Sequence, residues 1–195
     1  LINDLDAGIQ QGIDAVMIPK VEDAADVRVI ADIIGEFEME RGLDLETVKI
    51  IALIESPAGL EQAYAVASLS RVAGLALGTE DFSLAMGVFP TAEMLDLPVR
   101  QIALAANAGG CISFAIPLSI AEFHDSDAFE HAARKARAIG CSGALCMTSE
   151  NERDEAHAIV AAWDQAVSQG KSVGTRNGKM IDKPVLLRAR RMLAP

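Results

Sequence analysis

The chain has 195 residues, a formal net charge of −11, 51% hydrophobic residues and only 4% aromatic residues. This length corresponds to one domain or slightly more, and the aliphatic content is too high for an intrinsically disordered chain. The acidic balance and the scarcity of aromatic residues argue against a nucleic-acid partner. No apolar run reaches the roughly 18 residues of a membrane span, so no membrane association is expected.

The three cysteines occur at irregular spacing, and an odd number of this kind does not form a disulfide framework. A reducing cytoplasm is the simplest compartment for a protein with this cysteine usage. The first residues, Leu1-Ile2-Asn3-Asp4, are neither a signal peptide nor a natural initiator. We therefore expect the sequence to begin partway through a longer chain.

Short aliphatic runs alternate with segments of helical periodicity along the chain. We expect strands at residues 14–19, 48–54, 72–77, 111–116 and 143–147. We expect helices at residues 24–40, 57–68, 94–108, 126–139, 150–168 and 183–193, with a polar loop at 170–178. The run 48–54 is aliphatic except for Lys49, as in a strand covered on both faces. The alternation predicts an α/β fold with a parallel sheet, and an open doubly wound sheet and a closed eight-stranded barrel both fit it.

The charge is distributed unevenly. Residues 171–191 hold seven basic residues and one acidic residue, a balance of +6, whereas the remainder of the chain carries −17. Such a segment can meet a phosphorylated ligand or an acidic neighbouring subunit, or it can be a solvated helix face.

Carboxylates follow the expected strands at the points where functional groups of parallel α/β folds gather. Glu55 comes directly after the strand 48–54, where a buried charge is costly unless it is paired or binds a metal. Asp81 follows the strand 72–77 after a Gly78-Thr79 turn. Two carboxylates from adjacent strand ends can bind Mg²⁺, with water and substrate oxygens as the other ligands. The alternative is that Glu55 pairs with Lys20 and that Asp81 caps the following helix.

Lys20 and the three histidines are weaker candidates for functional residues. Lys20 ends the first expected strand, where it can form a Schiff base, as in some aldolases, or pair with a neighbouring acid. His124, His131 and His157 lack the spacing of metal ligands, so we interpret them as surface or packing residues.

Three motifs in this order resemble the HpcH/HpaI aldolase and citrate lyase beta-subunit superfamily: IPKVE at residues 18–22, ALIESPAG at 52–59 and LGTEDF at 77–82. The resemblance is closest to the citrate lyase beta-subunit-like branch. It covers the whole chain and ends with GKMIDKP at residues 178–184.

This resemblance implies a TIM barrel of which the chain supplies about the last five strands. Residues 1–170 would be the barrel portion, and residues 171–195 a basic C-terminal segment with a short helix. It further implies Mg²⁺ or Mn²⁺ held by Glu55 and Asp81 as the catalytic pair, at the carboxyl-terminal face of the barrel. We expect Lys20 and Glu22 to contact the metal ligands or the substrate. We expect Gly78 and Thr79 to bind the substrate.

The implied reaction is retro-aldol or Claisen cleavage of a β-hydroxyacyl thioester of coenzyme A, such as a malyl, citramalyl or citryl thioester, to an acyl-CoA and a 2-oxo acid. The alternatives are an aldolase acting on free acids, a malyl-CoA thioesterase and a non-catalytic scaffold subunit. The superfamily also implies a homo-oligomer, a trimer or a hexamer.

The sequence departs from the family pattern in two ways. The family's early strands, including an acidic strand-end motif and the strand with an enolate-stabilising Arg, are absent, which again indicates a fragment or the ordered part of a longer chain. The family often carries a His-Pro motif after the last strand, where this chain has CMTSEN at residues 146–151. We therefore expect substrate or CoA contacts there to be altered.

Overall fold

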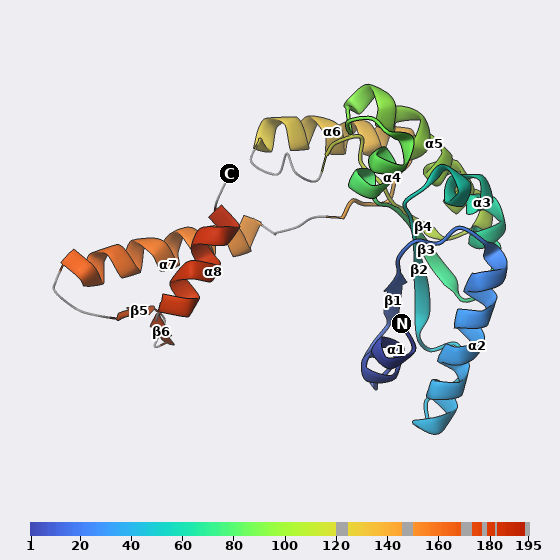
Figure 1. Cartoon of the computed structure of the whole chain (residues 1–195), viewed down its shortest axis with the longest axis horizontal. Helices are drawn as coiled ribbons and strands as arrows, with labels where there is room; N and C mark the ends of the chain where they lie inside the picture. The colour runs from blue at the N-terminus through green and yellow to red at the C-terminus, as the bar shows by residue number, and fades with distance from the viewer. Residues whose placement is uncertain (120–124, 146–149, 169–172, 177–178, 182, 194–195) are drawn as a thin grey trace. The chain divides into compact units, whose positions relative to one another are not determined.

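The computed structural model describes residues 1–119, 125–145, 150–168, 173–176, 179–181 and 183–193 (Figure 1). Contacts divide the chain into two compact units, Leu1–Leu145 and Cys146–Pro195. The helix at 150–168 thus belongs with the C-terminal elements, and the predicted barrel portion 1–170 stays a prediction. No helix in the described ranges is both long and apolar enough to cross a membrane.

A parallel sheet lies at the centre of the first unit. Its strands, in spatial order, are β1 (Ala15–Ile18), β2 (Lys49–Ile54), β3 (Val72–Leu77) and β4 (Ile112–Phe114). The register aligns the strand ends, because Ile18 pairs with Ala52 and Ile54 pairs with Leu77. These strands confirm the expected α/β class and bring the carboxyl ends of β1, β2 and β3 to one edge of the sheet.

The predicted strand at 143–147 is wrong within its described part. Gly143 forms a single parallel bridge to Phe114, and residues 146–147 lie outside the described ranges. The Ser142 and Gly143 N–H groups donate to the Ser113 carbonyl at 2.9 and 3.0 Å. The Ser113 and Ser142 hydroxyls also each accept a hydrogen bond of 3.2 Å from the other residue's N–H. The pairing ends at this bridge, because residues 144 and 145 form no strand.

Helices alternate with the strands of the first unit: α1 (Ile2–Gly8), α2 (Ala24–Glu40), α3 (Pro57–Ala67), α4 (Thr79–Met86), α5 (Ala92–Gly109) and α6 (Ser126–Ile139). Helices α1 and α4 were not expected, because each is short and buries few apolar residues. Helix α5 begins two residues earlier than predicted, since the Thr91 hydroxyl accepts a hydrogen bond from the Met94 N–H and caps it.

Figure 1 shows helices α2, α3 and α5 along one side of the sheet. In β2 the alternate residues Ile50, Ala52 and Ile54 are fully buried, whereas the residues between them are half-buried. The expectation that this strand is covered on both faces is therefore wrong for the structure described. One face of β2 packs into the apolar core and the other stays partly open.

The second unit consists of α7 (Glu150–Ser168), β5 (Gly174–Arg176), β6 (Lys179–Ile181) and α8 (Lys183–Leu193). Strands β5 and β6 form an antiparallel pair, so the predicted loop at 170–178 is wrong for residues 174–176. Helix α7 contacts both α8 and β5. The buried side chains are mostly small or aliphatic: Ala156, Ala166, Ile181, Leu186 and Ala189.

Candidate active site

Three successive connections meet at the carboxyl-terminal edge of the sheet. Lys20 follows β1, Glu55 follows β2, and Gly78 with Asp81 follows β3. Because β1, β2 and β3 are neighbours in a parallel sheet, their ends lie side by side. The structure thereby brings together Lys20, Glu55, Gly78 and Asp81, which are four of the six predicted site residues.

The Glu55 carboxylate is half-buried and held from the β1 side. Its Oε2 accepts a hydrogen bond of 2.7 Å from the Lys20 backbone N–H. Burial raises the pKa of Glu55, the Lys20 N–H lowers it, and the charge and hydrogen bonding of the neighbouring Asp81 carboxyl raise it again. The net effect is a raised pKa, because burial and then the neighbouring Asp81 carboxyl disfavour the charged form of Glu55.

Asp81 lies on the β3 side of the site. It is exposed and belongs to the first turn of α4, whose N-cap is Gly78 without a side-chain cap. The expectation that Asp81 caps the helix is therefore wrong, since its carboxyl interacts with Glu55 instead. The other alternative, a Glu55–Lys20 pair, exists in a different form, because the contact uses the backbone N–H of Lys20.

Gly78 makes room for Glu55. A Cβ added at Gly78 would lie 2.6 Å from Glu55 Cγ and 3.0 Å from Glu55 Oε1. The Gly78 N–H continues the sheet by donating to the Ile54 carbonyl at 2.9 Å. Thr79 is buried at the start of α4, where its carbonyl accepts a 2.6 Å hydrogen bond from the Ser83 hydroxyl. The predicted substrate contacts of Gly78 and Thr79 stay predictions.

Glu22 links the segment that follows β1 to the start of helix α3 by a hydrogen bond. Its Oε1 accepts a 2.6 Å hydrogen bond from the Ser56 hydroxyl, and the same hydroxyl accepts one of 3.1 Å from the Gly59 N–H as the N-cap of α3. A Cβ at Gly59 would lie 2.2 Å from the Val21 carbonyl oxygen, so only glycine allows this close approach. Glu22 is exposed and part of a local network, and its predicted substrate contact stays a prediction.

From the sequence, strand alternation points Glu80 away from its neighbour Asp81, so Glu80 is not a predicted site residue. In the structure Glu80 Oε1 accepts a 2.6 Å hydrogen bond from the hydroxyl of Ser119, which follows β4. This contact joins the start of α4 to the fourth strand connection. The sequence around either residue does not predict this hydrogen bond, because the partners are 39 residues apart. His131 and His157 are exposed, which confirms their surface assignment, and His124 lies outside the described residues.

The donor set at this edge fits Mg²⁺. In the ranges that the structure describes, no group of three or more His, Cys, Asp or Glu side chains is placed to hold a metal ion. Zinc sites need such a group, whereas Mg²⁺ is usually bound by one or two carboxylates together with water and substrate oxygens. Glu55 and Asp81 supply two carboxylates, and a cation between them would offset the repulsion that raises the pKa of Glu55.

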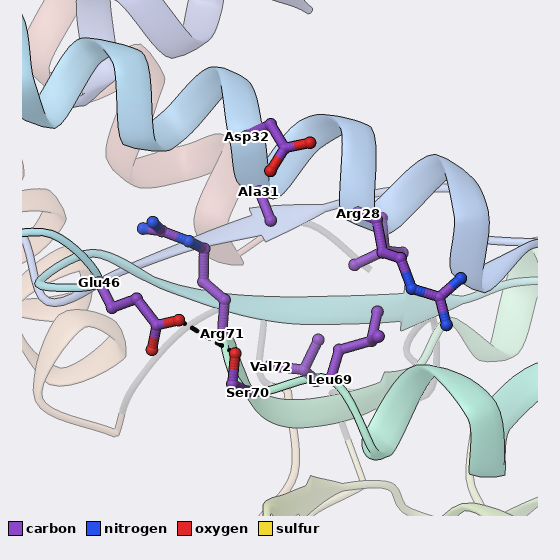
Figure 2. Close-up of a pocket in the computed structure, with 9 residues that line it drawn as sticks. Arg28, Ala31, Asp32, Glu46, Leu69, Ser70, Arg71 and Val72 are labelled. Carbon is purple, nitrogen blue, oxygen red and sulfur yellow. Dashed lines mark hydrogen bonds between the residues drawn. The ribbon is translucent and has the colours of Figure 1, made fainter.

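A pocket of about 380 Å³ lies at the other edge of the sheet (Figure 2). Its lining includes Glu46, which precedes β2, and Ser70 and Arg71, which precede β3. Figure 2 shows the Ser70–Glu46 hydrogen bond, 3.0 Å long, beside Arg71. The pocket is therefore remote from Glu55 and Asp81, which lie at the strand ends where parallel α/β folds gather their functional groups.

Comparison with known proteins places the chain in one family. Residues 1–149 match the family model HpcH/HpaI aldolase/citrate lyase. The chain is 30% identical to citrate lyase subunit beta of Leuconostoc mesenteroides subsp. cremoris, over 98% of this chain and 68% of that protein. It is 25% identical to (3S)-malyl-CoA thioesterase of Cereibacter sphaeroides, over 98% of this chain and 68% of that protein. Both relatives are thus longer than the chain.

Among solved structures, the chain is similar to protein CitE from Mycobacterium tuberculosis, in complex with magnesium, acetoacetate and coenzyme A. The identity is 25%, the TM-score is 0.55, and the match covers 98% of this chain and 71% of that one. RipC from Yersinia pestis matches with a TM-score of 0.64 and 23% identity over 75% of this chain and 65% of that one, which supports the fold. By the family-model match and by the near-complete coverage at 30% identity, the chain belongs to the HpcH/HpaI aldolase/citrate lyase family.

Proposed function

We propose that this chain carries the metal-binding edge of a Mg²⁺-dependent carbon–carbon lyase. The substrate is a β-hydroxyacyl thioester of coenzyme A, and the products are an acyl-CoA and a 2-oxo acid. The proposal includes the barrel, with the described parallel sheet as one part of its wall. The observation that carries it is the Glu55–Asp81 contact at the carboxyl ends of adjacent strands.

Each residue of the site has a stated part in this proposal. Glu55 and Asp81 would hold the metal, and a bound metal would supply a Lewis acid that the oxygens of the 2-oxo acid could chelate. Lys20 extends an exposed side chain beside Glu55, where its ammonium can attract the carboxylate of an anionic substrate. Gly78 and Thr79 line the β3 side of the substrate. The magnesium and coenzyme A of the Mycobacterium tuberculosis structure support this ligand class.

The first experiment is calorimetric titration of the protein with Mg²⁺, alone and with glyoxylate, pyruvate or oxaloacetate. We expect Mg²⁺ binding that one 2-oxo acid strengthens, because that acid supplies ligand oxygens. Glu55→Gln should weaken Mg²⁺ binding at least tenfold, on the scale of disrupted metal sites. The matched control is Glu61→Gln, which alters an exposed carboxylate on α3. Equal Mg²⁺ binding by both variants would rule out Glu55 as a ligand, and no binding by the unaltered protein would favour a scaffold subunit.

A thioesterase is the second candidate, favoured by the similarity to (3S)-malyl-CoA thioesterase. The two reactions differ in the bond that breaks. A lyase acting on malyl-CoA releases glyoxylate and acetyl-CoA without a free thiol, whereas a thioesterase releases malate and free CoA. A thiol-specific reagent and a glyoxylate assay on the same sample therefore separate the two functions.

A further inference from the structure

Lys20 has an unusual backbone conformation for its residue type. In the described part of the chain, Lys20 (φ 54°) and Glu46 (φ 62°) are the non-glycine residues with positive φ. Residues with a Cβ avoid this left-handed region because of steric crowding, and such outliers gather at functional sites. The Lys20 outlier lies next to Glu55, which is the main residue of the proposed site.

At Lys20 the chain departs from the pattern of the sheet, and the Lys20 N–H donates to a side chain. Before it, Ile18 pairs with Ala52 in the β1–β2 ladder, and after it, the Val21 N–H donates to the Leu53 carbonyl at 3.2 Å. Between these two anchors the chain leaves the ladder, and the Lys20 N–H reaches Glu55 Oε2 at 2.7 Å. The loop is fixed on its far side too, since the Val21 carbonyl lies against Gly59 of α3.

The two carboxylate oxygens of Glu55 have different neighbours. Oε2 is occupied by the Lys20 N–H. Oε1 lies on the β3 side, as its 3.0 Å distance from a Cβ at Gly78 indicates, and Gly78 is three residues before Asp81. Hydrogen bonds of this kind orient ligating groups in metal sites and set which atom faces the metal.

We infer that Lys20 is a positioning residue that acts through its left-handed backbone: its N–H fixes Oε2 of Glu55 and so presents Oε1 to the metal. This inference rests on the proposed metal site. It assigns a role to the Lys20 main chain that is separate from the proposed attraction of substrate by the Lys20 ammonium.

Three substitutions separate the main chain from the side chain. Lys20→Gly, Lys20→Asn and Lys20→Val all remove the ammonium and keep the N–H, but they differ in their tolerance of positive φ. Glycine and asparagine adopt it readily, whereas a β-branched valine resists it. We expect Lys20→Gly and Lys20→Asn to bind Mn²⁺ within about twofold of the unaltered protein, and Lys20→Val to bind it about tenfold to a hundredfold more weakly.

The measurement is the concentration of free Mn²⁺ by electron paramagnetic resonance, on the full chain without substrate. Thermal unfolding of each variant, followed by circular dichroism, checks that the fold persists at the assay temperature. If substrate binding uses the ammonium, KM rises to a similar degree in Lys20→Gly and Lys20→Asn, whose metal sites stay intact. The metal affinity and KM therefore report the two roles of Lys20 independently.

A second variant keeps the inference testable if Lys20→Val does not fold. Gly78→Ala places a methyl group 2.6 Å from Glu55 Cγ and displaces the carboxylate from the other side. We expect it to weaken Mn²⁺ binding about tenfold or more. Gly8→Ala is the matched control, since a Cβ there meets no atom within 4 Å.

The outcomes distinguish this inference from the proposed function. Graded affinities, with Gly and Asn near the unaltered protein and Val far below it, support the inference. Equal Mn²⁺ affinities for Lys20→Gly and folded Lys20→Val overturn it and leave the metal site standing, as does a Gly78→Ala protein that binds Mn²⁺ as well as Gly8→Ala. Absence of Mn²⁺ binding by the unaltered protein overturns the proposed function and the inference with it.

Discussion

The ionised Glu55 carboxylate is suited to metal binding, but without a metal its charge is unfavourable in the folded protein. Its carboxyl is half-buried and lies beside the Asp81 carboxyl, and both features raise its pKa, while the Lys20 N–H only partly offsets them. A raised folded-state pKa means that the folded protein holds this proton more tightly than the unfolded chain does. The resulting stability is present below the ordinary glutamate pKa of 4.5 and is lost as the pH rises through the raised value.

We therefore predict that Glu55→Gln stabilises the metal-free protein at neutral pH. The gain should be small, about 0.5 kcal/mol, because the site is partly exposed and solvent screens the charges. Thermal unfolding in the presence of a chelator, measured from pH 4 to pH 8, checks this. The variant and the unaltered protein should unfold at similar temperatures in acid and diverge as the pH rises, whereas Glu61→Gln should show no such divergence. A variant that is less stable at pH 8 would mean that the Lys20 hydrogen bond outweighs the repulsion.

At the scale of elements, a buried ion pair joins α2 to the amino-terminal ends of β2 and β3. Glu38 is fully buried, and both of its oxygens lie 2.9 Å from Nη1 of Arg71, which precedes β3. Glu38 also accepts hydrogen bonds from the Val48 N–H at 2.7 Å and the Glu46 N–H at 2.9 Å. Burial alone would raise the pKa of Glu38, but the donors from Val48, Arg71 and Glu46 outweigh it and lower the pKa. Both carboxylate oxygens of Glu38 are thus hydrogen-bonded, at the edge of the sheet remote from Glu55.

Removal of one partner of this pair should destabilise the protein strongly. We predict that Glu38→Ala lowers the free energy of unfolding by about 3–5 kcal/mol, since it leaves the Arg71 guanidinium buried without its carboxylate. The exposed Glu36, on the same helix, provides the control Glu36→Ala, for which we expect a change within about 0.5 kcal/mol. Urea unfolding measures both. The double variant Glu38→Leu/Arg71→Met should recover part of the loss, because it leaves no unpaired charge, and a double variant as unstable as Glu38→Ala would contradict this explanation.

At the scale of the whole molecule, large apolar side chains are exposed around the end of α4 and the residues that follow it. Leu84 and Phe89 are 76% and 87% exposed, and Met86 and Val88 are each 49% exposed. A cluster of exposed apolar residues of this size marks an interaction surface in many proteins. It agrees with the homo-oligomer that the family resemblance predicts.

We predict that the protein forms a trimer or a hexamer and that Leu84→Ser/Phe89→Ser shifts it toward a smaller species. The physical reason is that the double substitution removes apolar area that association would bury. Size-exclusion chromatography with light scattering measures the mass. Leu45→Ser, at a 61% exposed leucine before β2, serves as the control and should leave the mass unchanged. A monomeric unaltered protein would exclude this surface as a homo-oligomer interface.

The α/β class and the positions of most elements could be predicted from the amino-acid sequence, whereas the two carboxylates of the proposed site stay a prediction. The class and the elements follow from local signals, namely aliphatic runs of strand length and helical periodicity. Glu55 is singled out by another local signal, a charge where a buried strand ends. Some short elements were not predicted from the sequence. Helix α4 and the β5–β6 pair are too short for a clear period, and the run at 143–147 has strand-like residues but forms one bridge.

The contacts between the site residues depend on the tertiary structure. Asp81 looks like a helix cap from its sequence position, but the alignment of β2 and β3 places its carboxyl against Glu55. Lys20 draws attention for its ammonium, yet its N–H makes the contact, because the chain leaves the β1–β2 ladder with a positive φ. The Glu22–Ser56 and Glu80–Ser119 hydrogen bonds join residues 34 and 39 positions apart. Such contacts depend on strand order and register, which no local pattern encodes.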